Sequence, residues 1–233
     1  MIPLKDENPI QITPVCTVGL ILLNVLVFLY ELSLGNRVDQ FVLLYGAIPH
    51  TLLHGEGSRS LAAIPPSLTV LTSMFLHGGL LHVAGNMLYL WIFGNNIEDV
   101  LGHVRFLLFY VISGYAAAYA HALSESNSMM PMIGASGAIS GVLGAYLVLF
   151  PKVRVLTLVP FGFFIQAVRI PAVVVLGFWF VIQFINGTAS LRAVSLGRVG
   201  EGVAWFAHIG GFVAGMILIL IFPRRKPARY RWG

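Results

Sequence analysis

The run GASGAISGVLGAYLVLF, residues 134–150, decides how this chain folds. It predicts a helix that carries one hydroxyl group, that of Ser136, close to its N-terminal end. At about 1.5 Å per residue the helix is about 25 Å long, which is shorter than the roughly 30 Å of hydrocarbon in a bilayer. We therefore expect Ser136 to lie below the membrane surface. At that end of a helix the first N–H groups have no intrahelical acceptor and favour a developing negative charge.

The composition of the whole chain is that of an integral membrane protein. The 233 residues are 58% hydrophobic and 10% charged, whereas soluble domains have roughly 25% charged residues. Apolar runs of spanning length, bounded by charge, Pro or Gly, lie at residues 15–34, 78–97, 106–122, 134–150, 170–186 and 202–222. The sequence thus predicts an all-α fold, a polytopic membrane bundle of six transmembrane helices. We expect the bundle to form a single domain over residues 1–233.

The connections between these runs differ in length and character. Residues 35–77 form a long first external loop, with too many Pro and Gly for a single helix and enough apolar side chains to fold against the outer leaflet. Residues 151–171 are apolar but interrupted by Pro and Gly, which favours an interfacial link. Short cytoplasmic tails are expected at about residues 1–11 and 223–233.

The basic residues indicate an orientation in the membrane. With six spans, ten of the 14 Lys and Arg fall on the side shared by both termini and four on the other. The positive-inside rule then places both termini in the cytoplasm. Because these charges are spread over the loops, we expect a lipid bilayer and no nucleic acid as partner. The short tails, without a transit-like presequence, favour a prokaryotic plasma membrane.

Three polar side chains in other apolar runs are expected at the depth of Ser136. His82 and Asn86 are four residues apart and share one helix face. Measured from the starts of their runs, they lie about 6 and 12 Å deep, and His208 lies about 9 Å deep. All of them enter from the external side in the predicted topology. We therefore expect three helices to bring these side chains together with Ser136.

Small residues predict which helices pack together. The stripe in the fourth run is Ser136, Ser140 and Gly144, and the stripe in the last run is His208, Gly211 and Gly215. Gly137 and Gly141 are assigned to helix packing as well. Faces of this kind let two helix backbones approach closely. The spacing therefore predicts that the fourth and last helices pack with His208 beside Ser136.

This set of side chains is suited to acyl transfer. A serine hydroxyl needs a general base to become a nucleophile, and a neutral imidazole can accept its proton. No Asp or Glu is expected at this depth to orient His208, which favours a dyad over a triad. The Ser136 N–H, the Asn86 amide and a His82 N–H can donate to an oxyanion. One such donor contributes a factor of about 10²–10³ in rate.

Three motifs in this order resemble the rhomboid family of intramembrane serine proteases: HGGLLHVAGN at 77–86, GASG at 134–137 and AHIGGFVAG at 207–215. The resemblance extends over essentially the whole chain. It implies that Ser136 is the nucleophile and His208 its base, with His82 and Asn86 assisting the oxyanion; Gly134 is assigned with them to positioning the substrate. It also implies single-span membrane proteins as substrates, a small residue before the cut, and no metal or cofactor.

The chain departs from some family members in two places. Residues 35–77 contain no Trp, and hence no Trp-Arg pair. Ser140 stands where some members carry a tyrosine that packs on the base, so the sequence leaves open how His208 is held. Two other functions also stay open: a catalytically silent rhomboid-like protein that binds membrane clients, and a haem- or ion-handling bundle with His82 and His208 as ligands.

Overall fold

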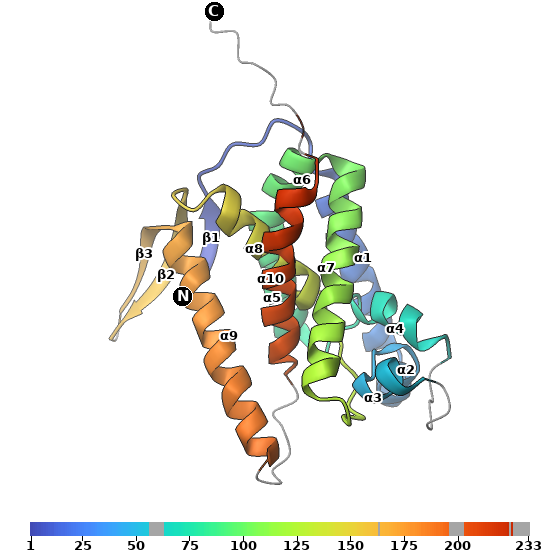
Figure 1. Ribbon diagram of the computed structural model, residues 1–233. Coiled ribbons are helices and arrows are strands. Elements are labelled where there is room, and N and C mark those ends of the chain that lie inside the picture. The colour runs from blue at the N-terminus through green and yellow to red at the C-terminus, as the bar shows by residue number, and fades with distance from the viewer. Residues whose placement is uncertain (56–62, 163, 196–202, 224, 226–233) are drawn as a thin grey trace, which may run out of the picture.

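Helix α8, Ser136–Leu149, runs through the centre of the molecule (Figure 1). The structure is a computed structural model that describes residues 1–55, 63–162, 164–195, 203–223 and 225. All residues of α8 from Ala138 to Tyr146 are buried, as expected of a helix that is apolar on every face. It packs chiefly against α10, Trp205–Ile221, and α7, His103–Ser124. Ser136 is thus the first residue of the most enclosed helix.

The backbones of α8 and α10 touch at glycines. A Cβ atom on Gly211 would collide with the carbonyl oxygen of Gly137, and one on Gly215 would collide with the carbonyl oxygen of Gly141. A backbone carbonyl inside a helix cannot turn aside as the end of a flexible side chain can. The close approach of the two helices therefore depends on the absence of side chains at these positions.

The face of α8 that meets α10 also includes Gly144, whose added Cβ would collide with the carbonyl oxygen of Phe212. Ser140 has a different contact from the one that the predicted stripe implies. Its hydroxyl is buried and donates a hydrogen bond of 2.6 Å to the carbonyl oxygen of Ser136, one turn earlier. The stripe in direct contact with the α10 backbone is therefore a glycine stripe.

The described parts of the six apolar runs are largely helical. The first forms α1, Val15–Ser33, and the fifth forms α9, Ala172–Ser195. The second forms a continuous helical stretch made of α5, Leu80–Tyr89, a π-helical turn η2, Leu90–Gly94, and α6, Asn95–Leu101. Among the described residues, three helices are long and apolar enough to cross a membrane, namely Val15–Ser33, His103–Ser124 and Ala172–Arg192. Helices α8 and α10 are shorter and apolar.

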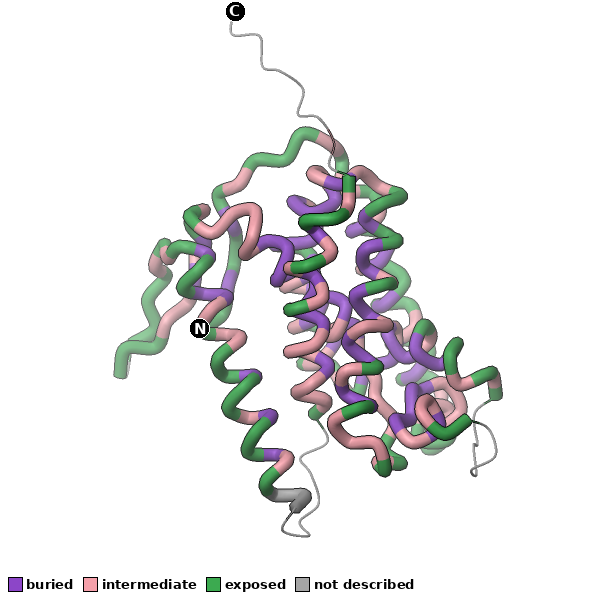
Figure 2. The backbone as a smooth tube through the Cα atoms, viewed as in Figure 1, coloured by how far each residue is buried: buried purple, intermediate pink, exposed green. Residues whose placement is uncertain are grey.

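Two of the long helices, α1 and α9, expose large apolar side chains along much of their length. In Figure 2 much of the tube of α9 is green, the colour of exposed residues. On α1 these include Leu22, Leu26 and Leu29, and on α9 they include Phe178 and Phe184. Soluble proteins rarely leave contiguous apolar surface of this extent in water. The exposed faces of α1 and α9 are thus suited to contact with lipid.

The segment between α1 and α5 contains several short helices. They are η1, Gly35–Arg37, α2, Val38–Tyr45, α3, Pro49–His54, and α4, Pro66–Ser73. Residues 56–62 of the predicted loop lie outside the described residues. Helices α3 and α4 begin at prolines, whose fixed φ suits the first turn of a helix, and both pack against α7.

This segment also holds the link that leads into α8. Ala47 and Met132 form an isolated antiparallel bridge, with hydrogen bonds of 3.1 and 2.7 Å in the two directions. The N–H of Gly134 donates to the carbonyl oxygen of Ser73 at 2.8 Å. The backbone just before Ser136 is therefore tied to two points far earlier in the chain.

The chain is not entirely helical, so the prediction of an all-α fold was wrong in this respect. Strands β1, Ile2–Asp6, β2, Arg154–Phe161, and β3, Phe164–Pro171, form an antiparallel sheet in the order β1-β2-β3 (Figure 1). Val155 and Thr157 are buried and their neighbours are more exposed, which is the period of two typical of a strand. The segments expected to be a tail and an interfacial link thus pair with each other.

A buried carboxylate joins this sheet to the helices. Asp6 Oδ2 accepts hydrogen bonds of 2.8 Å from the Tyr146 hydroxyl on α8 and from Asn96 Nδ2 on α6. Burial raises the pKa of the Asp6 carboxyl above its ordinary value, and the hydrogen bonds from Tyr146 and Asn96 oppose this shift. Asp6 therefore anchors β1 to the helices, and the free-energy cost of burying its ionised carboxylate makes this anchor depend on pH.

The stability of the protein should depend on pH through Asp6. Because its pKa is raised in the folded state, the carboxyl contributes stability below its ordinary pKa of about 3.9, and this contribution is lost as pH rises through the folded pKa. We expect the Tm of Asp6→Asn in detergent micelles to increase relative to that of the native chain as pH is raised. The exposed Asp39 provides the control variant, Asp39→Asn. A Tm difference that stays constant with pH would contradict this assignment.

Candidate active site

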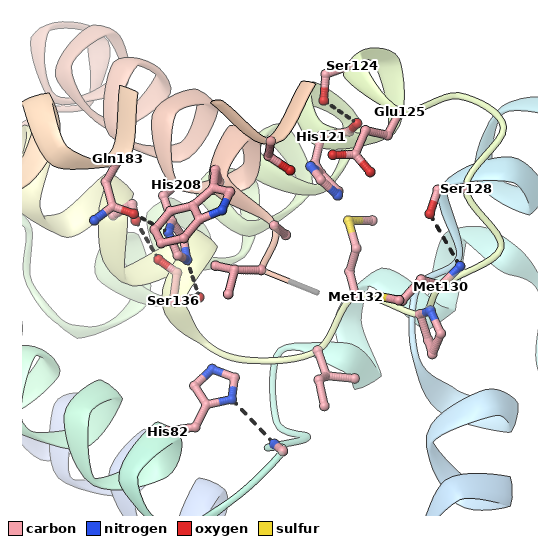
Figure 3. Close-up of a pocket in the computed structure, with 18 of the residues that line it drawn as sticks. His82, His121, Ser124, Glu125, Ser128, Met130, Met132, Ser136, Gln183 and His208 are labelled. Carbon is pink, nitrogen blue, oxygen red and sulfur yellow. Dashed lines mark hydrogen bonds between the residues drawn. The ribbon is translucent and has the colours of Figure 1, made fainter. Parts of the chain in front are cut away.

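Ser136 and His208 are in hydrogen-bond contact. His208 Nε2 lies 2.8 Å from Ser136 Oγ, as the dashed line in Figure 3 marks. Ser136 is the first residue of α8, and His208 lies in the first turn of α10. Both residues are partly exposed. The glycine contact between the two helices begins at Gly137, next to Ser136, and at Gly211, about one turn after His208, and holds the two side chains at this distance.

The imidazole of His208 is enclosed on its other sides. Its Nδ1 lies 2.7 Å from Oε1 of Gln183 on α9. The ring of Trp179 lies beside it with ring centroids 6.0 Å apart, and the ring of Trp205 is perpendicular to it at 6.2 Å. The sequence interpretation gave no role to Gln183. Its signal was an amide in the middle of a largely apolar spanning run, where polar groups usually mark a site.

His82 lies against the backbone of Gly134. Its Nδ1 accepts a hydrogen bond of 3.3 Å from the N–H of Gly78, so the ring proton lies on Nε2. Gly134 has a φ of +119°, and a Cβ added there would lie 2.7 Å from His82 Nε2. Glycine is thus required both by the backbone conformation and by the space. The structure thus brings His82 close to Gly134, which lies two residues before Ser136 in the sequence.

Asn86 is oriented by residues that the sequence interpretation left without a role. Its Nδ2 donates to Nε2 of His77 at 2.9 Å, while Nδ1 of His77 faces the carbonyl oxygen of Phe75 at 3.2 Å. The N–H of His77 donates to the carboxylate of Glu31 at 3.1 Å. Asn86 Nδ2 would lie 3.6 Å from a Cβ on Gly134. One amide hydrogen of Asn86 is therefore used by His77, and the second has no acceptor among the described residues.

These side chains line one cavity of about 1010 Å³ (Figure 3). Helices α5, α7, α8, α9 and α10 contribute to it, together with residues of the link before α8. The Ser136–His208 pair and His82 lie on opposite sides of the cavity, and His121 and Glu125 line another part of it. The cavity is large enough to admit an extended peptide segment beside the hydroxyl of Ser136.

The comparison with known protein families shows the family to which the chain belongs. The sequence model of the Rhomboid domain matches residues 67–225, which is more than half of the chain. This chain is a member of the rhomboid family. The match includes both residues of the Ser136–His208 pair as well as His82 and Asn86. The family and the apolar helices together show that the site belongs to a multi-pass membrane protein.

Several relatives share the rhomboid domain at moderate identity. Rhomboid protease GluP of Bacillus subtilis is 31% identical over 204 residues, covering 87% of this chain and 34% of the relative. RHOMBOID-like protein 1 of Arabidopsis thaliana is 33% identical over 159 residues, covering 68% and 35%. The mitochondrial presenilin-associated rhomboid-like protein of Rattus norvegicus is 28% identical over 223 residues, covering 87% and 54%. This rhomboid thus spans between a third and about half of their lengths.

Proposed function

We propose that this rhomboid protein is an intramembrane serine endopeptidase in which Ser136 is the nucleophile and His208 the general base. The observation that carries the proposal is the 2.8 Å contact between Ser136 Oγ and His208 Nε2 at the edge of a cavity. A nucleophile and a base within hydrogen-bond reach, with the base oriented by a third group, are the signature of covalent catalysis. The relationship to a rhomboid protease supports the same reaction.

The reaction proceeds in two halves. Ser136 Oγ attacks the carbonyl carbon of the scissile peptide bond while His208 Nε2 takes the hydroxyl proton. The tetrahedral intermediate collapses, the C–N bond breaks, and the imidazolium gives its proton to the leaving amine. Water then attacks the acyl-enzyme ester with His208 again as base. Ser136 is released with its proton restored, and the second product leaves with a new carboxylate.

The negative charge of the tetrahedral intermediate requires hydrogen-bond donors close to the carbonyl oxygen that Ser136 Oγ attacks. His82 offers Nε2–H, Asn86 offers the amide hydrogen that His77 does not use, and the N–H of Ser136 lies at the start of α8. An N–H in the first turn of a helix has no intrahelical acceptor and is aligned with the positive end of the helix dipole. These three groups form the proposed oxyanion hole.

Replacing Asn86 tests this assignment. We expect Asn86→Ala to lower kcat by about 10²- to 10³-fold with little change in KM, because the donor acts mainly in the transition state. The control is Asn95→Ala, which changes an amide outside the cavity lining. Kinetics of cleavage of a fluorogenic single-span peptide in detergent micelles separate the two constants. A rise in KM with unchanged kcat would assign Asn86 to ground-state binding instead.

The proposed substrates are single-span membrane proteins cut near the external end of their transmembrane helices. In the proposed topology six helices cross the membrane, both termini are cytoplasmic, and the membrane is a prokaryotic plasma membrane. The ten-to-four distribution of Lys and Arg between the two sides supports this orientation. Arg59, Arg198, Arg224, Lys226, Arg229 and Arg231 belong to that distribution and lie outside the described residues.

Both ring nitrogens of His208 are engaged, by Ser136 and by Gln183, which supports the dyad over a role as a haem or metal ligand.

The experiment that tests the function is cleavage in proteoliposomes. The native chain is expected to cut a single-span peptide into two fragments, and Ser136→Ala is expected to leave it whole. Equal cleavage by both would end the proposal. Binding of the peptide without cleavage by the native chain would assign the protein to the catalytically silent class.

A further inference from the structure

One face of α9 brings an amide to the base of the proposed dyad. Trp179, Gln183 and Gly187 follow one another at intervals of four residues and therefore share a helix face. A Cβ on Gly187 would lie 3.3 Å from Cβ of Trp205, so α9 comes close to the start of α10 at this point. One turn earlier on α9, this approach places Gln183 against the imidazole of His208.

The contact between the two side chains has a direction. Gln183 Oε1 lies 2.7 Å from His208 Nδ1, and an amide oxygen can only accept a hydrogen bond. The ring proton of neutral His208 therefore belongs on Nδ1, which leaves the lone pair of Nε2 free to accept the proton of Ser136. With the proton on Nε2 instead, the imidazole would present an N–H to Ser136 Oγ and could not act as its base.

We infer that Gln183 is a positioning residue that selects the productive tautomer and orientation of His208. The inference rests on the proposed dyad, because a tautomer matters only if His208 has to take a proton. It assigns to a neutral amide the place that a carboxylate holds in a catalytic triad. Gln183 does not touch the reacting atoms and acts only through His208.

The other neighbours of His208 do not supply this acceptor. The indole groups of Trp179 and Trp205 have an N–H donor and no acceptor nitrogen. Ser140 directs its hydroxyl to the carbonyl oxygen of Ser136. Among the hydrogen bonds found for the described residues, Gln183 is the acceptor at Nδ1.

The burial of Gln183 supports the same role. Gln183 is 7% exposed, and the turns of α9 that precede it, from Ala172 to Ile182, carry only apolar residues. A buried amide costs free energy unless it is hydrogen-bonded, and more so at membrane depth. The hydrogen bond to His208 offsets this cost. A leucine of similar size would fill the position at lower cost if packing were its only role.

The first test is kinetic and compares two variants at the same position. We expect Gln183→Leu to lower kcat by about 10- to 100-fold with KM little changed, the loss typical when the outer hydrogen-bond partner of a metal-ligating histidine is removed. Gln183→Glu keeps an acceptor of the same length and should therefore lose less activity than Gln183→Leu. Gln166→Leu, the same change at an exposed position of β3, is the control.

The second test measures the proton itself. ¹⁵N NMR of histidine-labelled full-length protein in micelles, with the His208 signals assigned by their loss in His208→Ala, should report a protonated Nδ1 and an unprotonated Nε2. In Gln183→Leu the two nitrogens should move towards the opposite tautomer. A native spectrum with the proton on Nε2 would overturn the inference and does not depend on the folding of the Gln183→Leu variant. Native kcat in a folded Gln183→Leu variant would overturn it as well.

The two proposals fail in different ways. If Ser136→Ala is as active as the native chain, the proposed function is wrong, whatever the tautomer of His208. If Ser136→Ala is inactive while Gln183→Leu matches the native chain in kcat and spectrum, the dyad stands and the role of Gln183 is wrong.

Discussion

Replacing Ser136 by alanine is expected to lower kcat for cleavage of a single-span peptide by about 10⁴- to 10⁶-fold, and His208→Ala should cost about as much. The reason is that the two side chains act as one unit across a 2.8 Å hydrogen bond. Without the imidazole the hydroxyl has no base, and without the hydroxyl the imidazole has nothing to activate. The double variant Ser136→Ala with His208→Ala should therefore be no slower than either single variant.

The measurement is single-turnover cleavage in proteoliposomes, with the fold of each variant monitored by its Tm. Ser140→Ala, four residues along the same helix, is the matched control because its hydroxyl is bonded to the backbone carbonyl of Ser136. We expect it to keep activity within about tenfold of the native chain, since it loses one local hydrogen bond. Losses in Ser136→Ala and His208→Ala that multiply in the double variant would show that the two residues act independently.

Gly215→Ala should destabilise the protein by about 3 kcal/mol or more, the upper end of the range for overpacking. The added methyl group would collide with the carbonyl oxygen of Gly141 on α8. Helices α8 and α10 then have to separate, which also moves His208 away from Ser136. We therefore expect a lower Tm in micelles and a loss of cleavage activity together, although Gly215 lies about two turns from the dyad on α10.

Gly177 on α9 is the matched control for this substitution. A Cβ at Gly177 has no other atom within 4 Å, so Gly177→Ala should leave stability unchanged or raise it by up to about 1 kcal/mol, because alanine is the better helix former. Equal Tm values for Gly215→Ala and Gly177→Ala would contradict the role given to the contact between α8 and α10.

The helices and the Ser136–His208 contact could be predicted because each of the segments involved carries its own signal in the sequence. Long apolar runs indicate helices in a membrane protein, and small residues at helical spacing indicate which helices pack together. The spacing of Gly211 and Gly215 from His208 was enough to place that histidine on the face of α10 that meets α8. On α8 the predicted stripe was only partly right, because Gly137 and Gly141 contact Gly211 and Gly215 in the place expected for Ser136 and Ser140.

The sheet could not be predicted because its pairing is not local. Strand β1 pairs with β2 through partners such as Ile2 and Leu158, which are far apart in the sequence. The alternation of Val155 and Thr157 is short, and Pro160 and Gly162 close to it favoured an irregular link. The pairing of these two segments in a three-stranded sheet depends on how the helices place them in space, which the local sequence does not indicate.

The hydrogen-bond partners within the site were also beyond sequence reasoning. Glu31, His77 and Asn86 form a chain of contacts whose members lie on different segments. Gln183 was overlooked because no spacing in the sequence relates it to His208, although it is an amide within a largely apolar run. Interactions of this kind depend on the relative rotation of packed helices, which periodicity does not fix.

The central claim is that His208 activates Ser136 as a nucleophile, and covalent labelling tests it most directly. Native protein is treated with a fluorophosphonate, and the intact mass and the modified peptide are measured by mass spectrometry. One adduct on Ser136 is predicted in the native chain, with labelling abolished in Ser136→Ala and slowed by at least about 10³-fold in His208→Ala. An adduct on another residue, or equal labelling rates with and without His208, would contradict the account.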